Sequence, residues 1–201
     1  MSDRVGNTAA VELINGKFQV SSGQIMPVPI LCNEPYMNNL KNLSRFTPLG
    51  GSETFNIHSQ KWVERFPKAA HLIKNYDPAT SGSPVSYAWN ILDSIRPGQW
   101  QLVADVRNNI LYFRSDIGKG IKSIDVSKCD FSNKSPLTYL DINANTQGDV
   151  AKQFSKLTPE INDEYVIKGF PIGYENAEFY SSDKYVNLKR NLHQYVADKL
   201  K

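Results

Sequence analysis

Apolar and polar positions follow strand-like patterns in the first part of the chain. Residues 8–21 (TAAVELINGKFQVS) contain two short apolar and β-branched runs on either side of Asn15 and Gly16. An Asn-Gly pair accepts the positive φ angles of a tight turn, so this stretch predicts a β-hairpin. The run MPVPILC over residues 26–32 predicts a third strand. Its two prolines restrict the first half of that strand to a sheet edge, because proline has no N–H to donate.

The spacing then changes from that of strands to that of helices. Apolar residues recur at helical intervals in residues 35–46, which predicts a short helix directly after the third strand. A second helix is predicted within residues 59–76, where Pro67 either kinks it or marks its first turn. A third is predicted over residues 83–95, with Ser83 as its N-cap and a proline at the first helical position.

Strand patterns return in the middle of the chain. Residues 99–116 (QWQLVADVRNNILYFRSD) have aromatic and β-branched runs on both sides of Asn108 and Asn109, which predicts a second hairpin. Residues 121–126 extend it into a three-stranded meander. Beyond this the pattern weakens, and it predicts a strand over residues 135–142, a helix over 148–157 and an amphipathic helix over 182–200.

Composition supports a globular protein of mixed α+β class. The chain has 201 residues, of which 40% are hydrophobic and 11% aromatic, and no linker divides it. We therefore expect residues 1–201 to form a single domain. The net charge of +3 comes from 23 basic and 20 acidic residues scattered along the sequence. Nucleic-acid binding is not expected, because it normally requires a concentrated basic patch.

Neither a membrane segment nor a metal or cofactor site is predicted. No apolar run approaches the length of a spanning helix, and the first residues lack the features of an export signal. The compartment stays open, with the cytoplasm as the default. The chain contains two cysteines and three histidines, and their spacings are unlike those of zinc sites.

Local chemistry leaves three residues open to more than one interpretation. Cys32 ends an apolar run, where a buried thiol more often packs as a small hydrophobe than acts as a nucleophile. Asn33 either forms a turn or directs its amide at a developing oxyanion. Arg65, near a predicted helix start, either lies on the surface or belongs to a site.

The order of these segments resembles the later part of the choloylglycine hydrolase and penicillin V acylase family. The similar stretches are SDRVGNTAAVELINGKFQV, ILCNEP, ERFPKAAHLIK, QWQLVADVRNNILYFRSD and IKSIDVSKCDFS, together spanning about residues 3–131. In this family the second stretch usually reads Leu-Thr-Asn-x-Pro and the third Asp-Arg-Phe-x-Arg-Ala. The members are N-terminal-nucleophile (Ntn) hydrolases. The resemblance implies an αββα sandwich with antiparallel sheets, of which this chain would be the C-terminal part.

The resemblance also assigns roles. It implies that Asn33 helps form the oxyanion site and that Arg65 lies beside the nucleophile. Cys32 stands where the family commonly has threonine, so the resemblance gives it no catalytic role. The chain departs from the family pattern at three further positions, Glu64, Pro67 and Lys68.

The implied reaction is hydrolysis of a linear, non-peptide amide. Substrates across the family are bile-acid conjugates, penicillins and N-acyl amides, and the nucleophile is a cysteine that begins the mature chain. Here Met1 comes first and no cysteine precedes position 32. We therefore expect a truncated chain that is inactive alone and that associates with itself through exposed strand edges. The alternatives are an inactive remnant and an unrelated α+β binding domain.

Overall fold

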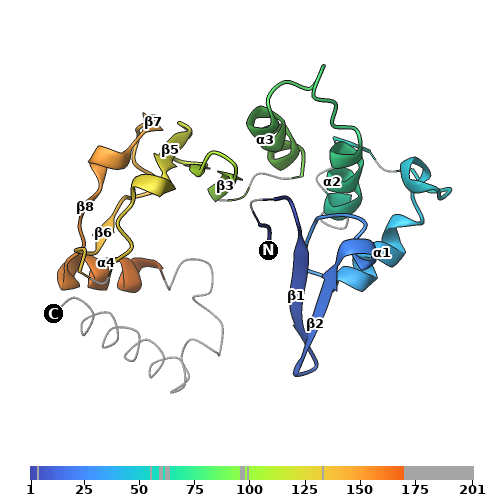
Figure 1. Cartoon of the computed structure of the whole chain (residues 1–201), viewed down its shortest axis with the longest axis horizontal. Helices are drawn as coiled ribbons and strands as arrows, with labels where there is room; N and C mark the ends of the chain where they lie inside the picture. Colours follow the sequence, from blue (N-terminus) through green and yellow to red (C-terminus); the bar gives the residue numbers. More distant parts are fainter. Residues whose placement is uncertain are drawn as a thin grey trace. The chain divides into compact units, whose positions relative to one another are not determined.

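The structure, a computed structural model, describes residues 1–169 apart from positions 4, 55, 59, 60, 62, 63, 96, 97, 99 and 133 (Figure 1). The chain divides into two compact units. The first contains Met1–Ser127 and Ile142–Asp149, and the second contains Lys128–Asp141 and Val150–Lys201. The prediction of a single domain over residues 1–201 is not tested by this division and stays a prediction.

The first unit begins with the predicted hairpin. Strand β1 (Ala9–Ile14) pairs with β2 (Lys17–Ser22) in an antiparallel register (Figure 1). The turn residues Asn15 and Gly16 have φ angles of 50° and 75°. Both angles lie in the left-handed region that a tight hairpin turn needs and that Asn and Gly tolerate best. The hairpin prediction is therefore confirmed.

The third strand predicted over residues 26–32 does not form. This segment pairs with no strand of the described chain. The Tyr36 hydroxyl instead donates to the Val28 carbonyl at 2.9 Å and accepts from the Val28 N–H at 3.4 Å. The Ile30 N–H also donates to the Val28 carbonyl. The two prolines remove donors that a ladder would use, so a side chain satisfies this backbone instead.

Helix α1 (Tyr36–Leu43) forms where the pattern predicted a helix, and a strand residue caps it. Pro35, at its N-cap, has no side chain that can accept a hydrogen bond. The Glu12 carboxylate on β1 takes that role and accepts from the Tyr36 N–H at 3.0 and 3.2 Å. A carboxylate at this end of a helix also interacts favourably with the helix dipole. The hairpin thus fixes the point at which α1 begins.

Helix α2 (Arg65–Lys74) contains the proline that the sequence left ambiguous. Pro67 is the third helical residue, so it marks the first turn and does not kink the helix. The first N–H groups of a helix have no partner within it, so a proline costs little there. The Tyr36 and Phe66 rings meet edge to face at 6.1 Å. Their contact joins α1 to α2 in a core formed by Ala10, Met26, Tyr36, Leu43, Phe66 and Ala70.

Helix α3 (Pro84–Ser94) connects the helical part of the unit to a sheet. Ser83 caps it as predicted, accepting a hydrogen bond from the Ser86 N–H. On its sheet-facing side, Arg114 lies over the Trp89 ring at 4.6 Å and pairs with Asp93. The cation therefore has both an aromatic face and a carboxylate as partners.

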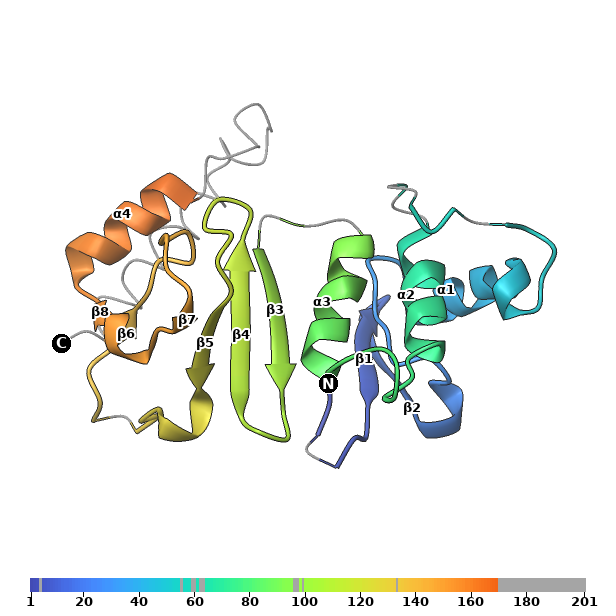
Figure 2. The ribbon, with the colours of Figure 1, turned by 90° about the horizontal axis from the view of Figure 1, so that it is seen from above.

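The predicted meander is also confirmed (Figure 2). It comprises β3 (Trp100–Asp105), β4 (Ile110–Ser115) and β5 (Lys122–Asp125), paired antiparallel in that order. The two-residue strand β7 (Gly148–Asp149) adds to β5 in parallel. Asn109, at the bend between β3 and β4, has a φ of 58°.

The sequence predictions were least accurate after residue 134, in segments that belong mostly to the second unit. No helix covers residues 148–157, which form β7, a 3-10 turn and β8 (Ser155–Lys156). Gly148 has a φ of 76° and Phe154 is extended, and neither conformation continues a helix. Strand β8 pairs with β6 (Thr138–Tyr139), which is much shorter than the strand predicted over residues 135–142.

Helix α4 (Pro159–Gly169) was not predicted at all, and the helix predicted over residues 182–200 lies outside the described residues. Within the described residues, the structure also has 3-10 turns at Gly23–Ile25, Thr47–Leu49, Val126–Lys128 and Ala151–Gln153. None of the helices that the structure describes combines the length and apolar composition needed to cross a membrane.

Candidate active site

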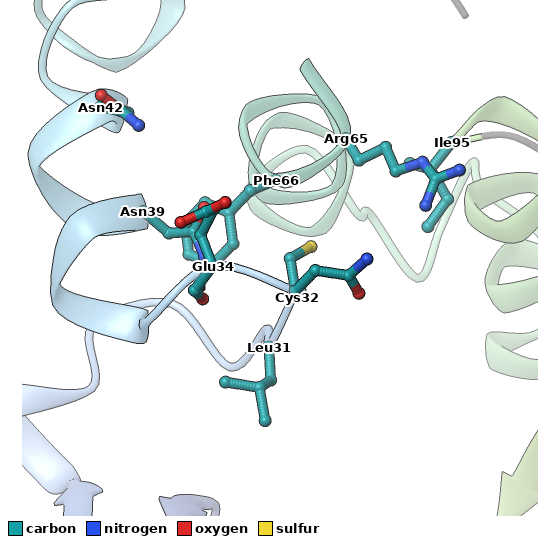
Figure 3. A pocket seen from close by; sticks show the side chains of 9 residues that line it. Leu31, Cys32, Glu34, Asn39, Asn42, Arg65, Phe66 and Ile95 are labelled. Carbon is teal, nitrogen blue, oxygen red and sulfur yellow. Dashed lines mark hydrogen bonds between the residues drawn. The ribbon is translucent and has the colours of Figure 1, made fainter. Parts of the chain in front are cut away.

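A pocket in the first unit contains both of the predicted site residues. Its volume is about 240 Å³. It is formed by the loop before α1, by one side of α1, by the start of α2 and by the residue after α3 (Figure 3). The residues that line it are Leu31, Cys32, Asn33, Glu34, Asn39, Asn42, Arg65, Phe66 and Ile95. Asn33 and Arg65, which are far apart in the sequence, thus meet at one cavity.

The loop that carries Asn33 is held from both sides. On the pocket side, the buried Asn39 amide donates to the Glu34 carbonyl at 2.8 Å. On the hairpin side, the Glu12 carboxylate accepts from the Tyr36 N–H. Both bonds fix backbone on the C-terminal side of Asn33, so they limit the positions that the Asn33 side chain can take.

Arg65 is the first residue of α2, and the core anchors its neighbours. Phe66 and Pro67 are both buried, which holds the helix start in place. The Arg65 Nε is itself buried and has no hydrogen-bond partner among the described residues. Such a donor is uncommon in folded proteins. Arg65 therefore lines the pocket with a guanidinium whose Nε has no partner within the described structure.

Cys32 lines the same pocket but in an environment that disfavours its thiolate. The side chain is partly buried and packs against the core, and in Figure 3 its thiol points toward α2. Burial raises the pKa of this thiol, and the positive charge of Arg65 lowers it by a smaller amount. Among the residues that the structure describes, no histidine lines the pocket. The arrangement agrees with the interpretation of Cys32 as a packing residue.

Sequence reasoning missed the two asparagines that α1 contributes. Asn39 and Asn42 are three positions apart, which places them on the same face of a helix. The predicted helix already contained this spacing, but no motif in the sequence indicated that the two asparagines belong to a site. Among the described residues, no three His, Cys, Asp or Glu side chains gather so that they could hold a metal ion.

Comparison with known proteins identifies the fold. No family model and no curated protein matches the sequence. Penicillin V acylase from Agrobacterium tumefaciens matches 77% of this chain with a TM-score of 0.60 and 19% identity. An arginine-to-leucine variant of conjugated bile acid hydrolase from Clostridium perfringens matches 78%, with a TM-score of 0.51 and 17% identity. The chain has the Ntn-hydrolase fold.

This confirms the predicted resemblance and fold class at the level of structure. Within the Ntn-hydrolase fold, the chain spans about half the length of the two structures, 55% of the acylase and 52% of the bile acid hydrolase. Its sheets are antiparallel apart from the short β5–β7 pairing. The catalytic roles of Asn33 and Arg65 are not tested by a match of fold and stay predictions.

Proposed function

We propose that this chain supplies the carbonyl-binding side of the active site of a linear-amide hydrolase. The observation that carries the proposal is the meeting of Asn33 and Arg65 at one pocket within a fold shared with two amide-hydrolysing enzymes. Substrates of the proposed class are small amides such as bile-acid conjugates, penicillins or N-acyl amides. A cavity of about 240 Å³ accepts the acyl portion next to the amide but not a folded protein.

The proposed chemistry follows from the two donors. Attack of a thiolate on the amide carbon converts the carbonyl oxygen into an oxyanion in a tetrahedral intermediate. The Asn33 amide donates a hydrogen bond to that oxygen, and the Arg65 guanidinium adds a positive charge close to it. Such preorganised donors typically contribute about 3 kcal/mol each to transition-state stabilisation. The base that removed the thiol proton returns it to the amide nitrogen, so collapse expels a neutral amine and leaves an acyl-enzyme, which water then hydrolyses to the carboxylic acid.

The proposal assigns no described residue as the nucleophile. Cys32 is the thiol at the pocket, but its raised pKa and the lack of a histidine among the lining residues leave it poorly activated. We therefore expect the 201-residue chain by itself to bind acyl groups without cleaving amides. Turnover of glycocholate or penicillin V that disappeared in a Cys32→Ala variant would contradict this expectation.

Binding can be tested on the chain as it stands. Phenoxyacetate and cholate, the acids released from penicillin V and glycocholate, would be titrated while the spectrum of the labelled protein is followed by NMR. Loss of a charge-assisted hydrogen bond should weaken binding about tenfold in Arg65→Gln, with a smaller loss in Asn33→Ala. Arg45→Gln is the matched control, because Arg45 forms an exposed ion pair with Glu53. Equal affinities in all three variants, or no binding at all, would reject the proposal.

The second candidate is a binding protein that has lost catalysis. The specific observation in its favour is the same unactivated Cys32 environment. The two candidates differ once a nucleophile-bearing polypeptide is supplied. The hydrolase should then turn over an amide in a manner that depends on Asn33, whereas the binding protein should only retain its ligand.

A further inference from the structure

The pocket is lined by two side chains of opposite charge that do not pair with each other. Glu34 and Arg65 both belong to its lining. Within the part of the chain that the structure describes, neither group forms an ion pair. In Figure 3 the Arg65 side chain extends toward Ile95 and away from Glu34. The cavity therefore offers a cation and an anion to a ligand at separate places.

The fold around the pocket does not use the Glu34 carboxylate. Glu34 precedes Pro35, the N-cap of α1, which is a position from which a carboxylate can stabilise a helix. Glu12 already takes that role by accepting from the Tyr36 N–H. The Glu34 side chain is exposed, and its carboxylate has no hydrogen-bond partner among the described residues. Only the main-chain carbonyl of this residue accepts a bond, from Asn39.

Helix α1 adds two amide groups to the same side of the pocket. Asn39 is 7% exposed and donates to the Glu34 carbonyl through its nitrogen, so its Oδ1 points elsewhere as an acceptor. That oxygen makes no hydrogen bond within the described structure, and the same holds for the exposed side chain of Asn42. We call Glu34, Asn39 and Asn42 the acceptor wall.

We propose that the acceptor wall binds a cationic group on the amine portion of the substrate, so that the pocket selects N-acyl amines with an ammonium at their free end. This rests on the proposed function, in which the amide oxygen lies at Asn33 and Arg65. An ammonium has three donors and a positive charge, which match the oxygens of the acceptor wall. An anionic amine portion would be repelled by Glu34. The acyl portion suits the apolar part of the lining, which consists of Leu31, Phe66 and Ile95.

Three amides that differ only in the amine portion test this selectivity. Because we expect the chain not to cleave amides, the phenoxyacetyl amides of ethylenediamine, propylamine and glycine can be titrated intact and followed by NMR. At neutral pH their free ends are an ammonium, a methyl group and a carboxylate. The ammonium amide should bind about fivefold more tightly than the propyl amide, and the glycine amide about fivefold more weakly, since Glu34 is an exposed charge. Salt should reduce both differences.

Two substitutions of Glu34 assign the selectivity to this residue. Glu34→Gln should abolish both differences, and Glu34→Lys should reverse the order of the charged amides. Both variants keep the main-chain bond between position 34 and Asn39. Glu53→Gln is the matched control, because it removes the same charge from an exposed ion pair that does not line the pocket. It should keep the parental order.

Equal affinities for the three amides, tightest binding of the glycine amide, or a parental order that persists in Glu34→Gln would overturn the proposal. Phenoxyacetate, which has no amine portion, keeps the two proposals apart. If it binds through Arg65 while the amides bind equally, only the role of the acceptor wall is wrong. If neither phenoxyacetate nor any amide binds, the proposed function is rejected as well.

Discussion

The pocket is lined by two neighbouring side chains of different chemistry, the thiol of Cys32 and the amide of Asn33. A thiolate next to an arginine would normally be stabilised, but here the cost of taking the charge out of water exceeds the attraction to Arg65. The amide needs no ionisation to donate a hydrogen bond. The local environment therefore favours Asn33 over Cys32 as the residue that interacts with substrate.

This balance predicts slow alkylation of Cys32. Because its pKa is raised, less thiolate is present at any given pH than in an unfolded chain, and the iodoacetamide rate profile should be displaced to higher pH. Arg65→Gln should displace the profile further in the same direction, since Arg65 is the group that lowers this pKa. Mass spectrometry resolves Cys32 from the exposed Cys129. A midpoint for the folded protein equal to or below that of the urea-unfolded chain would contradict the prediction.

A second prediction at this scale concerns Tyr36, whose side chain is fully buried. Its hydroxyl satisfies both backbone groups of Val28 in the segment that fails to form a strand. Tyr36→Phe should lower the free energy of unfolding by about 1–3 kcal/mol, because the Val28 N–H loses its partner and the Val28 carbonyl keeps only the Ile30 N–H. Urea unfolding measures the change. A loss below about 0.5 kcal/mol would mean that water replaces the hydroxyl.

At the scale of elements, the contact between Glu12 and α1 links the hairpin to the pocket. Glu12→Ala should destabilise the protein by about 1 kcal/mol through loss of the helix cap, and should also weaken binding of phenoxyacetate because the loop around Asn33 is released. The control Glu53→Ala removes an exposed ion pair and should leave the binding unchanged. Urea unfolding and NMR titration separate the two effects. Unchanged binding in Glu12→Ala would show that Asn39 alone positions the loop.

The sequence was sufficient to predict the elements that are specified by residues within them or directly beside them. Asn15-Gly16 encodes a turn, Ser83 encodes a helix cap, and both lie beside the structure they specify. The failure at residues 26–32 has a different origin, since a strand exists only if a distant partner pairs with it, and here the Tyr36 side chain occupies the backbone groups instead. The pocket was foreseeable only in part. The resemblance indicated Asn33 and Arg65. Asn39 contributes through a hydrogen bond to the main-chain carbonyl of Glu34, and no sequence motif indicates such a bond.

For the whole molecule, one side of the β1–β2 hairpin has a consequence that can be measured on the purified chain. We call this side the hairpin face; it consists of the exposed residues Val11, Leu13, Phe18 and Val20. Phe18 and Leu13 are the most exposed of its four residues, and an exposed apolar patch promotes association in water. We expect sedimentation velocity to show association that increases with protein concentration. The Leu13→Ser and Phe18→Ser double variant should shift the onset to concentrations at least tenfold higher.

The control for this experiment is Phe131→Ser, which removes an equally exposed aromatic residue that is not part of the hairpin face. Its association should match that of the parent chain, because replacing one scattered apolar side chain removes little contiguous apolar area. Circular dichroism must first establish that all variants keep the parental spectrum, so that a change in association is not a change in folding. A parent chain that stays monomeric up to about 100 μM would contradict the prediction and show that the hairpin face is too small to cause association. If Phe131→Ser abolished association while the double variant did not, the contact would lie on another surface, and the hairpin face would lose its role in self-association.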